Sequence, residues 1–471
     1  MSVTQTPPIY ELGPDFYDEV QAAAFPQGIL RYRNQQAARI LGLDQLDDVQ
    51  WKKHFWSFDA LPDNIKKPLA LRYHGHQFQV YNPQLGDGRG FLFAQVFAGN
   101  KLYDLGTKGS GQTPYSRNGD GRLTLKGAFR EILATELLES YGVNTSKTFS
   151  VFETGESLDR QDEPSPTRSG VLVRMSHSHI RIGTFQRLAY LQQKDNISKL
   201  LHYCVRHYYP DLQSHAGAEL AAAFLKAVSH ALAETCASWM MAGFVHGVLN
   251  TDNMNITGES FDYGPYRFLP HYDPSFTAAY FDQSGLYCYG RQPASVLWSL
   301  YQLGSSLRVA YPELPIEDVL EDYADVFNFH VHQRLLRRLN LKNPLLDPQG
   351  AAELNSELVA NLFQFMDQEK ALFEQTLFDL HSGGSEERLA RSPLKNLYKK
   401  ESFKNLRAML EAFETESIEK EQHPYFLGSQ ACSLLIDELE SIWQPIAESD
   451  DWTAFTKKLQ DIRSFRGVYE P

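Results

Sequence analysis

The stretch that decides the fold of this chain is His246-Gly247-Val248-Leu249-Asn250-Thr251-Asp252-Asn253, which Asp262-Tyr263-Gly264 follows after a short gap. An apolar helical pattern over about residues 216–243 leads directly into it. Asn253 and Asp262 supply an amide oxygen and a carboxylate, and a magnesium ion on a nucleotide needs only one or two protein oxygens. Either residue alone is as easily a turn cap, but the pair in this order predicts a metal site with Asn253 and Asp262 as its ligands.

The spacing is that of the catalytic loop of kinase-like phosphotransferases. Those enzymes place a catalytic carboxylate two residues after the loop histidine, where this chain has Val248. Asp252 is the nearest carboxylate to the vacated position and is the candidate base, although a solvated loop Asp or a cap explains it equally well. We therefore expect either a chain that has stopped doing chemistry or a different chemistry with the same nucleotide.

The surrounding patterns predict an α+β, protein-kinase-like fold of two lobes. Residues 90–98 and 102–107 form strands of a hairpin around Gly99-Asn100, a helix follows at 123–141, and strands follow at 146–153 and 171–175. From Thr184 onward most segments have helical periodicity, including one long helix over 352–380. The strand-rich part is the small N-lobe and the helical part is the larger C-lobe.

Four regions follow from this reading. The predicted division is an N-terminal extension at 1–75, an N-lobe with nucleotide-binding loops at 76–190, a C-lobe with the catalytic loop and metal site at 191–345, and a helical C-terminal region at 346–471.

Lys108 ends the second strand of the predicted hairpin, as the ATP-contacting lysine of kinases does. Glu131 lies on the next helix and is the candidate partner that would hold the lysine toward phosphate. Glu136 lies on the same helix and competes for that role. Surface Lys and Glu are abundant, so the sequence alone leaves the pairing open.

Glycine and arginine provide candidate phosphate contacts on both sides of the hairpin. Gly86-Asp87-Gly88-Arg89 and Gly119-Asp120-Gly121-Arg122 would let backbone N–H groups approach phosphate, although hairpin turns use the same residues. Arg174 and Arg181 are spaced to clamp a triphosphate, or are surface ion-pair residues.

Composition narrows the class of protein and its partners. The chain has 471 residues, of which 42% are hydrophobic and 22% charged, as in soluble globular proteins. Its net charge of −13 argues against nucleic acid or an anionic membrane as the main partner, so any phosphate site must be a local basic pocket. Four cysteines that lie far apart and the lack of a signal-peptide pattern favour a reducing compartment, and we expect the cytoplasm.

A series of short motifs runs along the chain from about residue 70 to 300. The segments are 75–78 (GHQF), 83–89 (PQLGDGR), 105–117 (LGTKGSGQTPYSR), 119–122 (GDGR), 130–131 (RE), 173–174 (VR) with Arg181, 246–254 (HGVLNTDNM) and 261–265 (FDYGP). In content and order they resemble the selenoprotein O (YdiU) family of kinase-fold protein adenylyltransferases, whereas the C-terminal third matches poorly. The chain departs from the pattern at Gly90, where alanine is usual, and at His74, where a small residue is expected.

The resemblance implies that ATP binds reversed relative to kinases, so that AMP moves from MgATP to Ser, Thr or Tyr hydroxyls of protein substrates and pyrophosphate leaves. It implies that Asp252 is the general base and that Asn253 and Asp262 hold Mg²⁺ or Mn²⁺. The nucleotide contacts that it implies are Gly86, Gly88, Arg89, Lys108, Asp120, Gly121, Arg174, Arg181 and Asp262, with Glu131 as the partner of Lys108. A reversed nucleotide would also explain the loss of the usual base at Val248.

Three other functions stay open at this point. The chain is alternatively an ordinary phosphotransferase that uses Asp252 or a remote carboxylate, a catalytically inactive pseudokinase scaffold, or an enzyme that transfers UMP from UTP with manganese. Nothing in the sequence visibly reads the nucleotide base. Protein substrates are the expected partners, with no nucleic acid and no membrane, and a monomer is expected.

Overall fold

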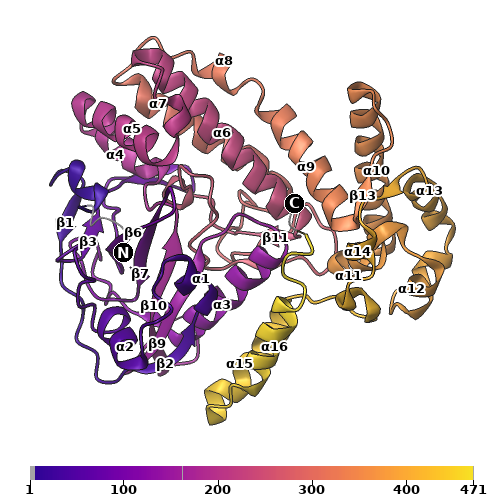
Figure 1. Cartoon of the computed structure of the whole chain (residues 1–471), viewed down its shortest axis with the longest axis horizontal. Coiled ribbons are helices and arrows are strands. Elements are labelled where there is room, and N and C mark those ends of the chain that lie inside the picture. The colour runs from indigo at the N-terminus through magenta and orange to yellow at the C-terminus, as the bar shows by residue number, and fades with distance from the viewer. Residues whose placement is uncertain (1–5, 162, 470–471) are drawn as a thin grey trace.

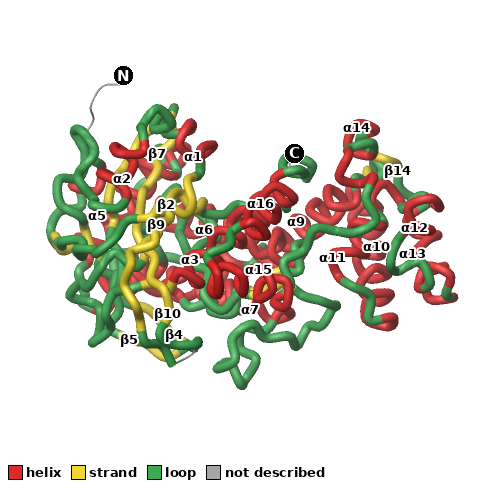
Figure 2. The backbone as a smooth tube through the Cα atoms, turned by 90° about the horizontal axis from the view of Figure 1, so that it is seen from below, coloured by secondary structure: helices red, strands yellow, loops and turns green. Residues whose placement is uncertain are grey.

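The computed structural model describes residues 6–161 and 163–469. It is a mixed α/β structure in which a strand-rich sheet occupies one end and helices fill the rest (Figure 1). Helices α10 to α14 lie farthest from the sheet, and α15 and α16 return to the space between them and the sheet (Figures 1 and 2).

An eight-stranded antiparallel sheet forms the strand-rich end. Its order is β1-β3-β6-β7-β10-β9-β2, with β8 paired to β10. The strands are β1 (Tyr17–Glu19), β2 (Ile29–Arg33), β3 (Leu69–Leu71), β6 (Leu92–Ala98), β7 (Lys101–Lys108), β8 (Leu123–Thr124), β9 (Lys147–Leu158) and β10 (Thr167–Ser176). Residues from the predicted extension at 1–75 thus share this sheet with residues from the predicted N-lobe. Three two-stranded pairs lie outside it: β4 (Gly75–Gln77) with β5 (Val80–Asn82), β11 (Phe244–Val245) with β12 (Arg267–Phe268), and β13 (Leu341–Lys342) with β14 (Glu414–Thr415).

The register of the central strands places two cations on one face. β6 and β7 form the predicted hairpin, turning at Gly99, whose φ of 59° suits glycine. Lys108 pairs with Leu172, and Arg174 pairs with Gly106 two positions back. Because side chains alternate along a strand, Lys108 and Arg174 project from the same face of the sheet.

Helix α3 (Leu125–Ser140) packs on β9 and β10 and matches the predicted helix at 123–141. Thr124 caps it by accepting a hydrogen bond from the Gly127 backbone N–H. Twelve of its sixteen residues are buried, so both faces of the helix are covered. Two shorter helices, α1 (Gln35–Ile40) and α2 (Asp48–Phe55), precede it.

Helices dominate from residue 182. They are α4 (Ile182–Tyr190), α5 (Lys194–Tyr208), α6 (Gly217–Met241), α7 (Gln292–Arg308), α8 (Ile316–Leu320) and α9 (Tyr323–Leu339). The long helix α6 ends just before Gly243, whose φ is 59°, and the chain then enters β11 and the loop at His246. Within the described residues, no helix is both long and apolar enough to cross a membrane.

The C-terminal region is also helical, but the prediction of one long helix within it is wrong. The expected single helix over 352–380 is two helices, α10 (Pro348–Glu369) and α11 (Phe373–Asp379), because Lys370 takes a left-handed backbone with φ of 48°. The helices that follow are α12 (Glu386–Arg391), α13 (Glu401–Leu410), α14 (Ile418–Glu421), α15 (Ile436–Ser449) and α16 (Thr453–Arg463).

Candidate active site

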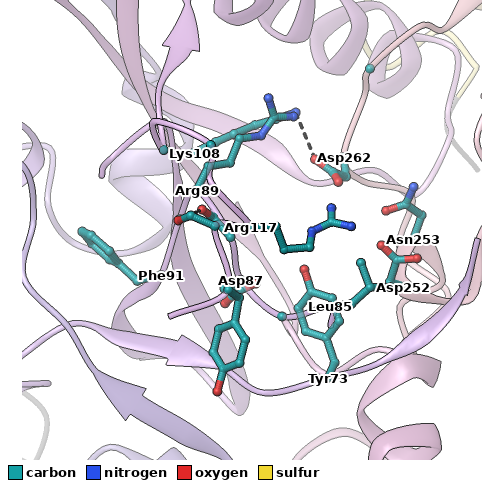
Figure 3. A pocket seen from close by; sticks show the side chains of 18 of the residues that line it. Tyr73, Leu85, Asp87, Arg89, Phe91, Lys108, Arg117, Asp252, Asn253 and Asp262 are labelled. Carbon is teal, nitrogen blue, oxygen red and sulfur yellow. Dashed lines mark hydrogen bonds and ion pairs between the residues drawn. The ribbon is translucent and has the colours of Figure 1, made fainter. Parts of the chain in front are cut away.

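A cavity of about 800 Å³ opens where loops of the sheet meet the loops that follow α6. Its volume lies within the range of small-molecule sites. The candidate base, metal ligands and nucleotide contacts named from the sequence all line it, whereas Glu131 and its rival Glu136 do not, and Figure 3 shows several of the lining residues. Those that line the cavity are Gly86, Gly88, Arg89, Lys108, Asp120, Gly121, Arg174, Arg181, Asp252, Asn253 and Asp262.

Lys108 belongs to a buried ion-pair network beside this cavity. Its Nζ lies 2.7 Å from Glu131 Oε2 and 2.9 Å from Asp262 Oδ1. Arg174 Nη2 donates to the same Asp262 oxygen at 3.2 Å. The competitor Glu136 does not contact Lys108, because it binds Arg463 near the end of the chain. Two cations therefore face two carboxylates, which offsets the cost of burying each charge.

Asp262 holds a conformation and a charge that suit a metal ligand. Its φ of 64° is left-handed, which Asp tolerates better than most residues. Burial acts to raise the pKa of Asp262, but Lys108 and Arg174 outweigh it and lower that pKa well below its usual range. Lys108 and Arg174 make their contacts with Oδ1, which leaves Oδ2 as the carboxylate oxygen better placed to bind a metal ion.

Asn253 ends a short 3-10 turn, Thr251–Asn253. Its Nδ2 donates to the Val248 carbonyl at 2.9 Å, which fixes the amide. Its oxygen lies on the side that faces Asp262 (Figure 3). Val248, the residue at the usual base position, therefore orients the amide through its backbone.

Asp252 is a buried carboxylate in the cavity wall. Its Oδ1 has no hydrogen-bond partner among the described residues. Burial raises the pKa of Asp252 to about 6, although Arg181 opposes the shift. Arg181 Nη1 also donates to the Asp252 backbone carbonyl at 3.3 Å. A carboxylate that lines a cavity and is not held in an ion pair is a candidate to accept a proton from a bound hydroxyl group.

The turn that carries Asp252 is braced by the β4 hairpin. The His76 backbone N–H donates to Thr251 Oγ1 at 2.8 Å, and the Phe78 N–H donates to Asn250 Oδ1 at 3.0 Å. A Cβ on Gly75 would lie 2.9 Å from Thr251 Oγ1. The GHQF segment therefore supports the turn that carries Asp252, a role that its sequence did not reveal.

The glycines at 86 and 88 are required by contact between two loops. A Cβ on Gly86 would lie 2.3 Å from Tyr115 Cγ, and one on Gly88 would lie 2.8 Å from the Tyr115 carbonyl oxygen. Thr113 and Ser116 tie the loops together by donating to the carbonyls of Asp87 and Gly88. Tight loop packing is therefore enough to explain these glycines without a phosphate.

Arginines give the cavity its positive charge. Arg89 and Arg117 are exposed, and their guanidinium groups make no hydrogen bond or ion pair with the described part of the chain, so both side chains are free to meet an anion. The Arg181 side chain, in contrast, already has partners: its Nη2 lies 3.4 Å from Asp87 Oδ1, and its Cζ lies 4.2 Å from the Tyr73 ring centroid. Asp120 lies at the rim, half exposed, and pairs with Arg160 at 2.9 Å.

Sequence reasoning missed several residues that shape the site. Asp87, Tyr73, Tyr115 and Arg117 all line the cavity. Asp87 and Arg117 stand inside the quoted motifs, so a signal was available there. Nothing in the sequence marks Tyr73 as a partner of Arg181, because more than a hundred residues separate them.

The donor set fits a hard divalent cation bound together with a nucleotide. Across residues 6–161 and 163–469, no three His, Cys, Asp or Glu side chains gather as a metal site. The Asn253 amide and the Asp262 carboxylate together form a different kind of donor set, with one amide oxygen and one carboxylate. It suits an ion such as Mg²⁺ or Mn²⁺ that takes its other ligands from water and phosphate.

Comparison with known proteins places the chain in a family. It matches the family model described as protein adenylyltransferase SelO over residues 1–463. A protein nucleotidyltransferase YdiU of Synechocystis sp. is 41% identical over 486 residues and covers 98% of each chain. Proteins of the same name from Trichormus variabilis and Gloeobacter violaceus are 42% and 43% identical, covering 98% and 97% of this chain and 96% and 94% of their own.

The fold, the cavity and these matches define an enzyme of the nucleotidyltransferase class. Within that class, the chain belongs to the SelO family. The resemblance seen in the central motifs is thereby confirmed, and it extends into the C-terminal third that matched poorly by motif.

Proposed function

We propose that this chain transfers AMP from MgATP to Ser, Thr or Tyr hydroxyls of protein substrates, within a two-lobed kinase-like fold. The observation that carries this proposal is the placement of Asp252, the candidate base. Val248 occupies the position of the kinase base, while Asp252, whose buried Oδ1 has no hydrogen-bond partner among the described residues, lines the same cavity as Asn253 and Asp262. The family match and the relatives' names support transfer of a nucleotide to protein.

In the proposed reaction, the acceptor hydroxyl oxygen attacks the α-phosphorus of ATP. The bond from that phosphorus to the bridging oxygen of the β-phosphate breaks, and pyrophosphate leaves. Asp252 takes the hydroxyl proton. Arg89 and Arg117 are free to neutralise the leaving pyrophosphate, and Lys108 is held toward the phosphates by Glu131. A cation between Asn253 and Asp262 would offset phosphate charge during the transfer.

Labelled nucleotides test the proposal. The protein is incubated with Mg²⁺ and ATP carrying ³²P at either the α- or the γ-phosphate, alone and with hydroxyl-rich acceptor proteins, and protein-bound label is counted. Label from the α-position is expected. Label from the γ-position alone would show a kinase, and no label from either would show a scaffold.

A parallel reaction with α-labelled UTP and Mn²⁺ tests the remaining alternative. The two nucleotides compete for one cavity, so their relative labelling rates at equal concentration report the preference directly. Faster labelling from UTP would replace AMP by UMP in the proposal and leave the role of Asp252 intact.

A further inference from the structure

Helix α3 carries two buried carboxylates that face in different directions. Glu131 and Glu136 are five residues apart, which turns their side chains about 140° from one another around the helix axis. Glu131 contacts Lys108 beside the cavity, whereas Glu136 contacts the C-terminal segment. Only 2% of the Glu136 side chain is exposed, so its charge requires partners.

Those partners come from the end of the chain. Arg463, the last residue of α16, places Nη2 2.6 Å from Glu136 Oε1 and Nε 2.9 Å from Oε2. Arg466 contacts Oε2 and also lies 3.1 Å from Glu139. The Tyr32 hydroxyl on β2 donates to Oε1. A two-point guanidinium contact with a buried carboxylate fixes both distance and orientation.

Apolar packing covers the same outer side of α3. The ring of Phe129 lies 5.4 Å from that of Trp443 on α15 and 5.6 Å from that of Phe455 on α16. Near the start of the helix, Lys126 pairs with Glu440 at 2.7 Å. The two C-terminal helices therefore contact α3 from its first turn to the turn that carries Glu136.

The turn between α15 and α16 is anchored to the sheet. Asp450 lies 2.9 Å from Arg31 on β2 and 2.6 Å from Arg168 on β10. Arg168 also donates to the Ile446 carbonyl at 2.8 Å. β10 pairs with β7, the strand that ends at Lys108. The hairpin therefore connects α3 to the same sheet that carries the lysine.

We propose that the C-terminal hairpin, α15 and α16 with Arg466, holds α3 at the depth at which Glu131 reaches Lys108. Glu136, Arg463 and Arg466 are then positioning residues for the nucleotide site. If α3 moves outward, Lys108 loses Glu131 and pairs with Asp262 alone, which opposes cation binding at that carboxylate. The inference rests on the proposed function for its transfer readout, and on nucleotide binding alone for its second readout.

A double-mutant comparison tests this chain of contacts. The single variants Arg463→Met and Glu136→Gln are compared with Glu131→Gln and with the double variant Glu131→Gln/Arg463→Met. For each variant, the Kd for ATP with Mg²⁺ and the rate of label transfer from α-labelled ATP are measured. Each single variant is expected to lower the transfer rate about tenfold or more. The double variant is expected to be no slower than Glu131→Gln alone, because Arg463 acts through Glu131.

Controls separate positioning from general stability. Lys457→Ala removes an exposed ion pair of 3.3 Å within α16 and should leave both readouts unchanged. Arg463→Lys, which keeps one charged contact, should recover most of the loss. If Arg463→Met fails to fold by thermal melting, Glu136→Gln, alone and combined with Glu131→Gln, supports the same comparison.

Wild-type affinity and rate in Arg463→Met and Glu136→Gln would overturn the inference, and so would additive losses in the double variant. A wild-type protein that binds MgATP but transfers no label would contradict the proposed function and not the inference about the hairpin. In that case the ATP affinities of the same variants still decide whether the hairpin positions Glu131.

Discussion

At the scale of single residues, Asp262 forms ion pairs with both buried cations of the site, Lys108 and Arg174. Asp262→Asn keeps the size and the left-handed backbone, which Asn tolerates, but removes the charge. Lys108 and Arg174 then face a neutral amide, and the cation loses its carboxylate ligand. We expect label transfer to fall about a hundredfold or more and the Mg²⁺ dependence of ATP affinity to disappear. Asp63→Asn is the matched control, because Asp63 also has a positive φ but is exposed and away from the cavity.

A different result is expected at Asp252, because Arg181 binds its backbone carbonyl and not its carboxylate, whose Oδ1 has no partner among the described residues. Asp252→Asn should slow label transfer about 10²- to 10⁴-fold, the contribution of a general base, while the Kd for ATP stays close to the wild-type value. Rapid-mixing kinetics with saturating ATP and isothermal titration calorimetry measure the two quantities. Unchanged turnover would remove Asp252 as the base.

At the scale of elements, the turn that carries Asp252 depends on the contact between α4 and the segment before β4. A Cβ on Gly183, in the first turn of α4, would lie 2.2 Å from the His74 carbonyl oxygen. Gly183→Ala must therefore move a backbone, and we expect a loss of about 1–3 kcal/mol in the free energy of unfolding. Urea denaturation measures it. Gly428→Ala should change little, since its nearest atom would be 3.5 Å away, and an equal loss in both variants would contradict the argument.

Several helices and strands could be predicted from the sequence. The β6–β7 hairpin, α3 and α6 follow from local periodicity and turn residues, and their observed bounds lie within one or two residues of the prediction. The break at Lys370 was missed because a lysine seldom takes a left-handed backbone, and no Gly or Pro marks the position.

Long-range partners lay outside the reach of sequence patterns. Helical spacing could name Glu131 and Glu136 as rivals for Lys108, yet it could not decide between them. The decision depends on where α16 docks, more than three hundred residues later in the chain. The candidate site residues could be predicted because they stand in short motifs. The role of Tyr73 and the hydrogen bonds that support the turn carrying Asp252 could not, because they depend on tertiary contacts.

At the scale of the whole molecule, the acidic chain concentrates positive charge at one place. The net charge is −13, yet seven Lys or Arg and four Asp side chains line the cavity. Such a basic pocket in an acidic surface attracts a small polyanion and disfavours extended ones such as nucleic acid. The expectation from composition, that any phosphate site is local, agrees with this distribution.

The packing of the C-terminal helices supplies a pH-dependent term in stability. His381 is 1% exposed and stacks on Phe426 with ring centroids 3.6 Å apart. Its ring nitrogens lie 3.3 Å and 3.4 Å from the carbonyl oxygens of Arg338 and Lys420. Burial lowers the pKa of His381 to about 3, from about 6.5 in the unfolded chain.

Because the unfolded state takes up this proton first, the native state loses stability as the pH falls from about 6.5 toward 3. Between pH 7 and pH 4.5 we expect this one site to cost about 2–3 kcal/mol in the free energy of unfolding. His381→Gln should remove that difference, measured by urea denaturation at both pH values, even if the variant is less stable at pH 7. His202→Gln, at an exposed histidine on α5, should keep the wild-type pH dependence. Equal pH dependence in His381→Gln and the wild-type protein would show that His381 is not the group responsible.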